Sequence, residues 1–222
     1  MKKLLLFVVL LLSFNTLVFG QFSMSVGPEL GLNFNLHGGG DIDEGGSGIG
    51  LLLAGTVDMA FNRSRSLGIQ TGFAFYDNRS GSSELTGQEQ NVAITTENDV
   101  SISYFQIYTL FKFRLPAGIY FVFGPQIGFD LSAELESTQT IMTPGYYFQG
   151  GSTSQKSKNT IKDTNSRFEL KMGGGFDIEL SDLITLTPQL TFGFGLSDVV
   201  EDVDYSIHTF QLGVACKFNV IR

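Results

Sequence analysis

The sequence predicts an all-β protein, an eight-stranded antiparallel up-and-down β-barrel that spans a membrane. Eight separate stretches alternate apolar and polar residues with a period of two, which is the pattern of strands with one apolar and one polar face. Tight turns and long loops alternate between these stretches, as in bacterial outer-membrane barrels. The apolar face carries the bulky side chains and the polar face carries the glycines, which suits a cramped lumen inside and lipid outside.

Residues 1–20 predict a secretory signal peptide. Lys2 and Lys3 precede a long apolar run that ends at the small residue Gly20. The alternative is a genuine membrane helix, but no other stretch approaches the ~20 apolar residues that a spanning helix needs. We therefore assign residues 21–222 to one barrel domain.

The first four strands are expected at residues 23–36, 49–61, 67–78 and about 99–115. Their outward apolar residues include, in chain order, Leu30 and Leu32, Leu51 and Leu53, Ile69 and Phe73, and Phe105 and Phe111. The period of two turns Tyr76 inward, at the end of the third strand. Val100 and Ile102 are out of phase with the rest of the fourth strand, which indicates a bulge or a section above the membrane.

The last four strands are expected at residues 118–135, 166–180, 183–197 and 206–220. Their outward residues include Phe121 and Phe123, Phe168 and Leu170, Leu190 and Phe192, and Phe210 and Leu212. Pro28, Pro125 and Pro188 fall inside strands, on the outward parity. Since proline cannot donate to a strand ladder, we expect local bulges at these three positions.

The connections alternate in length around the predicted barrel. Residues 62–66, 116–117 and 181–182 form tight turns, whereas residues 37–48, 77–98, 136–165 and 198–205 form longer loops. The short side is expected to be periplasmic, and an even strand count places both termini there. A soluble barrel of the lipocalin kind is the structural alternative, but its lumen would be overfilled by five or six large apolar side chains from each strand.

Charge and composition narrow the function classes. The formal net charge is −8, and it becomes −10 when the signal peptide takes Lys2 and Lys3 with it, so nucleic acid is not an expected partner. Cys216 is the only cysteine, which excludes an intrachain disulfide, and its parity makes it a small lipid-facing group. Tryptophan is absent, but 21 Phe and 7 Tyr can supply the aromatic girdles of a membrane barrel.

Charged residues on the inward parity are expected to form a lumen charge network. A small barrel leaves no continuous water channel, and unpaired buried charges are costly, so we expect a plug of ion pairs and hydrogen bonds. The functional alternative is an ion or proton path. The network comprises Glu29, Asp58, Lys112, Arg114, Asp130, Arg167, Glu169, Lys171, Asp177, Glu179 and Lys217, with Glu134 on the same parity.

The long loops carry the other candidate sites. Tyr146, Tyr147 and Phe148 are aromatics in a polar loop and form a candidate contact patch; alternatively they pack down onto the barrel rim. Two acidic clusters could offer oxygen ligands to calcium, but neither follows an established loop spacing, and acids also serve solubility. They are Asp41, Asp43 and Glu44, and Glu201, Asp202 and Asp204. We expect no metal and no cofactor.

His208 is the one candidate for catalysis. Some small outer-membrane barrels are lipid A deacylases or acyltransferases, and Ser206 lies two residues before His208, on the same strand face. No orienting acid is evident beside them. We therefore expect an interfacial histidine and a protein that is not an enzyme.

Three patches resemble one barrel family. Residues 104–114, YFQIYTLFKFR, are similar to the Y-L-x-I-P-L-L-x-K-Y segment of the PorT-like outer-membrane barrels common in Bacteroidota. The G-P-x-x-G and S-A elements of residues 120–133 and the L-G-V-x-Y-K-F ending at residues 212–218 resemble the same family. Tyr108 replaces the family's Pro, and Cys216 replaces its usual Tyr. The resemblance implies an OmpX-like barrel in the outer membrane and carries no ligand or reaction with it.

These observations favour a non-enzymatic integral outer-membrane protein with a structural or surface-interaction role. Loops on a rigid scaffold would carry the specificity. The alternatives are an accessory subunit of an envelope secretion or assembly complex, and a lipid A-modifying enzyme. Outer-membrane lipid is the expected partner, together with an envelope protein that the sequence does not identify.

Overall fold

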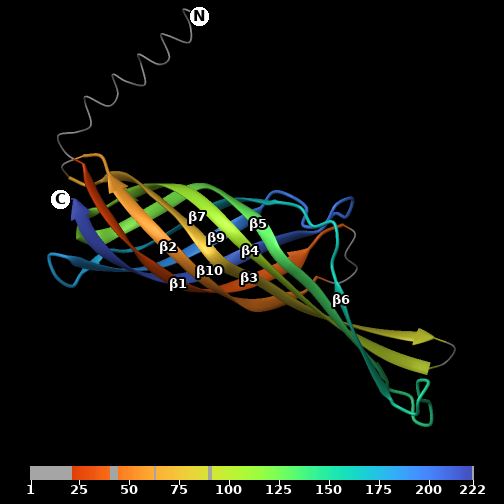
Figure 1. Cartoon of the computed structure of the whole chain (residues 1–222). Coiled ribbons are helices and arrows are strands. Elements are labelled where there is room, and N and C mark those ends of the chain that lie inside the picture. Colours follow the sequence, from red (N-terminus) through yellow and green to blue (C-terminus); the bar gives the residue numbers. More distant parts are fainter. Residues whose placement is uncertain (1–21, 41–44, 63, 90–91, 222) are drawn as a thin grey trace, which may run out of the picture.

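Successive wall strands pair antiparallel, and the first and last strands pair with each other, which closes a barrel (Figure 1). This computed structural model describes residues 22–40, 45–62, 64–89 and 92–221, so the predicted signal peptide lies outside the described residues. The strands are β1 (Ser23–Gly38), β2 (Ser47–Ala60), β3 (Leu67–Glu89), β4 (Val92–Arg114), β5 (Ile119–Ile141), β6 (Ser154–Thr160), β7 (Arg167–Phe176), β8 (Ile178–Glu179), β9 (Ile184–Gly195) and β10 (Ser206–Ile221). A 3₁₀ turn, η1 (Pro116–Gly118), joins β4 to β5. Among the described residues, no helix is long and apolar enough to cross a membrane.

The barrel wall has the predicted eight strands when β7 and β8 are counted as one. Both pair with β9 in a single register, since Gly175 opposes Gln189 and Ile178 opposes Leu186. Asp177 alone separates β7 from β8, so the two are segments of one interrupted strand. Within the described residues, β6 is the strand that pairs outside the wall, on β5.

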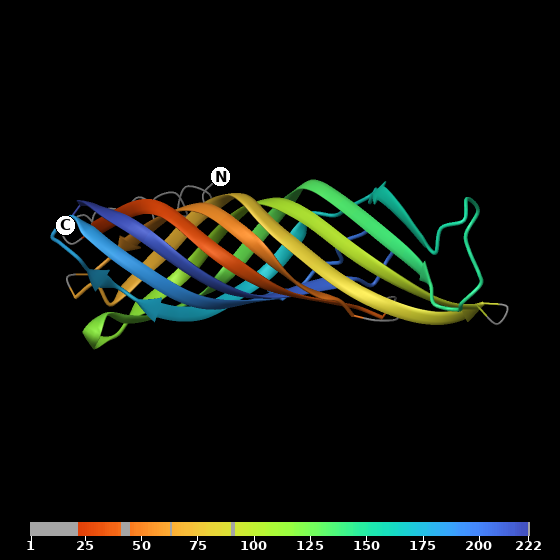
Figure 2. The ribbon, with the colours of Figure 1, turned by 90° about the horizontal axis from the view of Figure 1, so that it is seen from below.

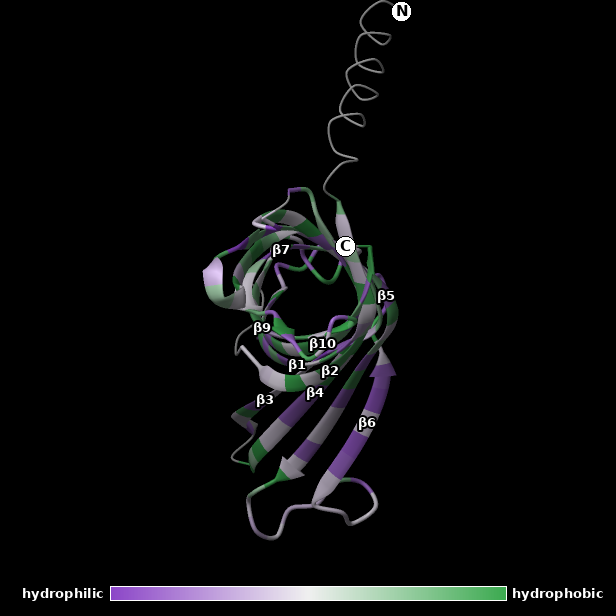
Figure 3. Ribbon diagram, turned by 90° about the vertical axis from the view of Figure 1, so that its left-hand side faces the viewer, coloured by the Kyte–Doolittle hydropathy of each residue, from purple (hydrophilic) through white to green (hydrophobic). Residues whose placement is uncertain are grey.

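The predicted parity of the wall is confirmed. Apolar side chains point out of the barrel, where Leu30 is 61% exposed, Phe111 69% and Leu190 57%. Their polar neighbours Glu29, Lys112 and Gln189 are buried inside. Apolar and polar residues therefore alternate along each wall strand, as the view along the barrel shows (Figure 3). A surface of this kind is stable in lipid rather than in water.

Two bulges that were not predicted change the parity of the wall strands. Phe75 and Tyr76 of β3 both face outward, because the register against β4 passes from Ala74 directly to Asp77. The expectation that Tyr76 points inward is therefore wrong, and the residues after the bulge are inverted. β5 has a similar shift at Leu131.

The three strand prolines do not produce the expected bulges. Register continues across each, with Pro28 opposite Gly55, Pro125 opposite Leu170 and Pro188 opposite Val214. On the other side of each proline, the pairing with the second neighbouring strand is interrupted and then resumes in the same register. A missing N–H thus interrupts one ladder without inserting a residue.

A sheet built from β3, β4, β5 and β6 extends far beyond the barrel (Figures 1 and 2). We call it the arm, comprising residues 81–89, 92–100 and 134–160. It projects from the barrel end opposite the C-terminus (Figure 1). Loops predicted at residues 77–98 and 136–165 are therefore wrong over much of their length, because they form paired strands there.

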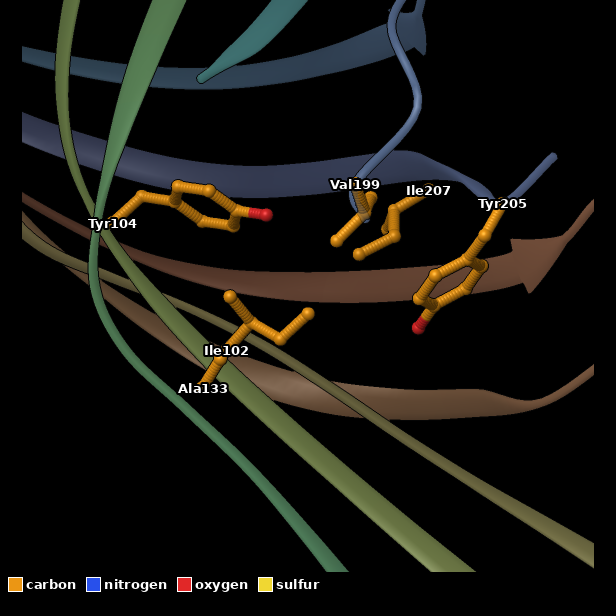
Figure 4. Packing of buried hydrophobic residues seen from close by; sticks show 6 residues of the cluster. All are labelled: Ile102, Tyr104, Ala133, Val199, Tyr205 and Ile207. Carbon is orange, nitrogen blue, oxygen red and sulfur yellow. The ribbon is translucent and has the colours of Figure 1, made fainter. Parts of the chain in front are cut away.

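An apolar layer lies inside the barrel at the base of the arm (Figure 4). Val199 of the β9–β10 loop packs with Ile207, Tyr205 and Ile102, and Val199, Ile207 and Ile102 are each 0% exposed. Ile102 was expected in a bulge or in a section above the membrane. A section above the membrane fits better than a bulge in β4. Ile102 faces inward with the same alternation as the rest of β4, and at this level the side chains inside the barrel are apolar rather than charged.

Candidate functional site

The lower part of the lumen, at the end with the short turns, holds a cluster of ion pairs. Asp58 Oδ2 lies 2.7 Å from Lys112 Nζ, 2.8 Å from Lys217 Nζ and 3.1 Å from Arg114 Nη2. Asp177 accepts from Arg114 Nε at 2.6 Å and from Lys112 Nζ at 3.1 Å. One carboxylate from β2 thus joins cations from β4 and β10 across the barrel.

The middle of the lumen is a hydrogen-bond network around Glu29. Its carboxylate accepts from Tyr108 at 2.9 Å, from Gln189 at 2.5 Å and from Gln211 at 3.3 Å. Lys171 donates to Gln211 at 2.8 Å. These side chains come from five different wall strands, so they fill the cross-section.

The upper part of the lumen, below the apolar layer, contains two buried guanidiniums. Arg79 donates to Asp77 Oδ2 through Nε at 2.8 Å and Nη2 at 2.6 Å. Arg167 lies 2.8 Å from Glu169 and also donates to the carbonyl of Ile207 at 2.7 Å. Arg79 lies 3.9 Å from Glu169, so the two pairs form one network.

Most of the predicted lumen charges lie in these layers, but three do not. Asp130 is exposed at the β5 bulge and accepts from Thr164 at 2.8 Å. Glu134 is exposed on the arm, beyond the bulge that reverses the parity. Glu179 keeps the inward parity but is the last residue of its wall strand, where its side chain is 72% exposed.

Sequence reasoning missed the buried pair of Asp77 and Arg79. Both were placed in a loop, and both are 0% exposed inside the barrel. The bulge at Phe75 and Tyr76 turns them inward. The usable signal was two adjacent aromatics in an otherwise alternating strand, because adjacent outward residues require a bulge.

Inward glycines create room for large side chains from across the lumen. A Cβ on Gly72 would lie 2.5 Å from the hydroxyl of Tyr108, and one on Gly175 would lie 2.5 Å from that of Tyr120. A Cβ on Gly193 would lie 1.3 Å from Glu169 Oε1. The glycines on the polar face therefore allow the lumen to be packed with large polar residues.

The two faces of the arm differ in charge. Residues directly opposite in the register share a face, and one face carries acids and lysines in cross-strand rows. Lys156 pairs with Glu136 at 2.5 Å and Lys158 with Glu134 at 2.9 Å. The hydrogen bond to Glu134 raises the pKa of the Lys158 ammonium. Glu84 lies directly opposite Glu97, an arrangement of like charges that does not stabilise a sheet.

The candidate aromatic patch lies at the tip of the arm. Tyr146 is 50% exposed and Tyr147 61%, and Phe148 is half-buried within the β5–β6 loop. The loop is closed by Phe148 N donating to Ser152 O at 2.8 Å. The alternative in which these aromatics pack onto the barrel rim is wrong, because the arm holds them away from the barrel (Figure 1).

His208 lies on the outer surface of the barrel among aromatic rings. It stacks on Phe194 with 4.7 Å between ring centroids, and its Nδ1 accepts from the backbone N–H of Gly195 at 3.2 Å. The Ser206 hydroxyl is directed to the carbonyl of Gly38 at 3.4 Å. This is the environment of an interfacial side chain and provides no hydroxyl–imidazole pair for nucleophilic catalysis.

The acidic clusters provide no assembled metal site in the described parts of the chain. Residues 41–44 lie outside those parts. In the remainder, no three His, Cys, Asp or Glu side chains gather in a way that could hold a metal ion, and this includes Glu201 and Asp202. Cys216, predicted to face lipid, has its side chain on the outer parity of β10, between outward Val214 and Phe218.

Comparison with known proteins identifies the kind of barrel. The family model described as outer membrane protein beta-barrel domain matches residues 12–201. No curated protein matches the chain significantly. Among solved structures, Ail, the attachment invasion locus protein of Yersinia pestis, is 14% identical with a TM-score of 0.38, covering 87% of this chain and 98% of that one. Neisserial surface protein A is 10% identical with a TM-score of 0.39, covering 88% and 97%. OprG from Pseudomonas aeruginosa is 8% identical with a TM-score of 0.36, covering 91% and 97%.

Proposed function

Because this chain belongs to the outer membrane protein beta-barrel domain family and is an integral outer-membrane protein, we propose that it is a non-enzymatic surface-interaction protein that binds a protein partner through its arm. The arm is the observation that carries this proposal. A barrel needs only short loops to close, whereas here β3, β4 and β5 continue beyond the wall as a paired sheet to which β6 adds a fourth strand.

The filled interior supports a binding role over transport. Three polar layers occupy the lumen, and the apolar layer of Val199, Ile207 and Ile102 lies above them. Eight strands leave an interior that side chains just fill. We therefore infer that this barrel acts through its surface rather than through a pore.

The arm offers two kinds of contact to a partner. Its tip presents Tyr146 and Tyr147, and exposed aromatics are frequent anchors at protein interfaces. Its charged face has an acidic excess, with Glu84, Glu97, Asp99, Glu134 and Glu136 against Lys156 and Lys158. We infer that the partner surface is basic and that charge complementarity guides its approach.

Affinity purification from native membranes tests this function. The double variants Tyr146→Ser/Tyr147→Ser and Glu84→Gln/Glu97→Gln should each recover a partner at least tenfold less well than the unmodified chain. Glu201→Gln/Asp202→Asn is the matched control, since it removes two exposed acids from a different loop. Failure to recover any partner, or equal recovery with all variants, would refute binding through the arm.

The identity of the partner also addresses the runner-up function. A stoichiometric envelope protein would make this chain an accessory subunit of a larger complex, and its arm would be the docking element.

We also propose membership of the PorT-like type, supported by the three patches at residues 104–114, 120–133 and 212–218. Those patches pack strands together, so they add no ligand or reaction.

A further inference from the structure

The barrel end opposite the arm contains a vestibule of about 530 Å³. It lies among the start of β1, the β2–β3 turn, η1 and the end of β10, and these short connections mark the periplasmic side. A volume of this size is typical of small-molecule sites, which also occur in the mouths of barrels. Hydroxyl donors surround it, namely Ser23, Ser25, Ser64, Ser66 and Thr185.

The floor of the vestibule has an excess of positive charge. Lys217 and Arg114 line the vestibule, and Lys112 lies directly behind this lining. Together they surround the carboxylates of Asp58 and Asp177, which leaves one net positive charge among these five described side chains. Lys112 and Lys217 are 2% and 1% exposed, so water screens this charge poorly.

The described charged side chains nearest to this cluster pair with one another. At the rim, Arg65 and Glu179 lie 4.0 Å apart and balance each other. Deeper in the lumen, Arg79, Arg167 and Lys171 are matched by Asp77, Glu169 and Glu29. Among these described side chains, the uncompensated charge therefore lies with Lys112, Lys217 and Arg114, beside the vestibule.

We propose that the vestibule binds a phosphate-type oxyanion from the periplasmic side. A net positive floor supplies attraction, and the hydroxyls and the partly exposed Arg114 guanidinium supply hydrogen bonds to oxygen. Free inorganic phosphate and the headgroup of an inner-leaflet phospholipid share this chemistry. This site is independent of the arm and of its partner.

Thermal unfolding of the purified full-length barrel in a non-ionic detergent tests the proposal. Sodium phosphate should raise the midpoint saturably above the value in sodium chloride of equal ionic strength, because a ligand that binds the folded state stabilises it. Arg114→Gln neutralises the floor and should weaken phosphate binding at least tenfold. Glu179→Gln removes an exposed acid from the rim and should strengthen binding several-fold.

Two further variants keep the test decisive. Lys158→Gln is the charge-matched control on the arm and should leave phosphate binding unchanged. Thr185→Val removes one lining hydroxyl at nearly constant volume, so it replaces Arg114→Gln if that variant does not fold, and it should weaken binding. Competition by dihexanoyl phosphatidylglycerol would indicate a headgroup, and its absence would indicate free phosphate. An unmodified protein insensitive to phosphate, or foldable Arg114→Gln and Thr185→Val variants that bind as the unmodified protein does, would overturn the proposal.

Discussion

Replacing Arg79 by methionine should destabilise the barrel more than any comparable change at its surface. Arg79 and Asp77 are both 0% exposed, and two nitrogens of the guanidinium donate to one carboxylate oxygen at 2.8 and 2.6 Å. Among the described residues, methionine leaves that buried carboxylate with the Asn33 amide as its hydrogen-bond donor. It also removes a cation that lies 3.9 Å from Glu169.

The expected loss is about 3–5 kcal/mol in the free energy of unfolding, the usual cost of breaking one partner out of a buried ion pair. Adding Asp77→Asn to Arg79→Met removes the stranded charge and keeps a polar group beside Asn33. The double variant should therefore recover at least half of the loss. Arg65→Met is the control, since Arg65 and Glu179 lie 4.0 Å apart at 44% and 72% exposure, and such pairs contribute at most about 1 kcal/mol.

Equilibrium urea unfolding in lipid vesicles, followed by far-UV circular dichroism and by the gel mobility of unheated samples, measures these differences. A loss for Arg79→Met no larger than that for Arg65→Met would refute the buried pair. So would a double variant that is less stable than Arg79→Met alone.

Three further outcomes follow from the packing of the wall and lumen. Leu212→Arg should cost about 2–4 kcal/mol on folding into bilayers, whereas Leu212→Phe should fold normally; equal stability of the two would mean that this face meets water. Gly193→Ala should cost about 1–3 kcal/mol, because its Cβ would lie 1.3 Å from Glu169 Oε1, whereas Gly87→Ala, with nothing within 4 Å, should be neutral on thermal unfolding. Planar bilayers should show no steady open-pore conductance, and a reproducible large pore would contradict the filled lumen.

The wall of this barrel was predictable because lipid imposes one simple rule on every strand. Each outward position must be apolar, so residues such as Leu30 and Leu212 reveal strand, face and architecture together. The lower charge cluster followed from the same parity, since Asp58, Lys112 and Lys217 all lie on the opposite face.

The alternation of apolar and polar residues no longer predicts which way a side chain faces where the strands extend beyond the wall or where a bulge adds a residue. The bulge at Tyr76 hid the buried Asp77 and Arg79, because one inserted residue inverts all later assignments. The strands of the arm were read as loops because neither of their faces meets lipid. With water on both sides, β6 can consist of Ser154–Thr160 without a single apolar residue. Pairing with β5, a tertiary interaction, makes it a strand.

Cysteine accessibility on intact cells tests the central account most directly, because it reports on the membrane, the topology and the arm together. In a Cys216→Ala background, Ser152→Cys places a thiol in the β5–β6 loop of the arm, and Ser64→Cys places one in the β2–β3 turn. Both positions are exposed on the folded protein. A membrane-impermeant maleimide should label Ser152→Cys on intact cells and should label Ser64→Cys only after permeabilisation. Reversed labelling, or equal labelling of both thiols on intact cells, would contradict an outer-membrane barrel whose arm faces outward.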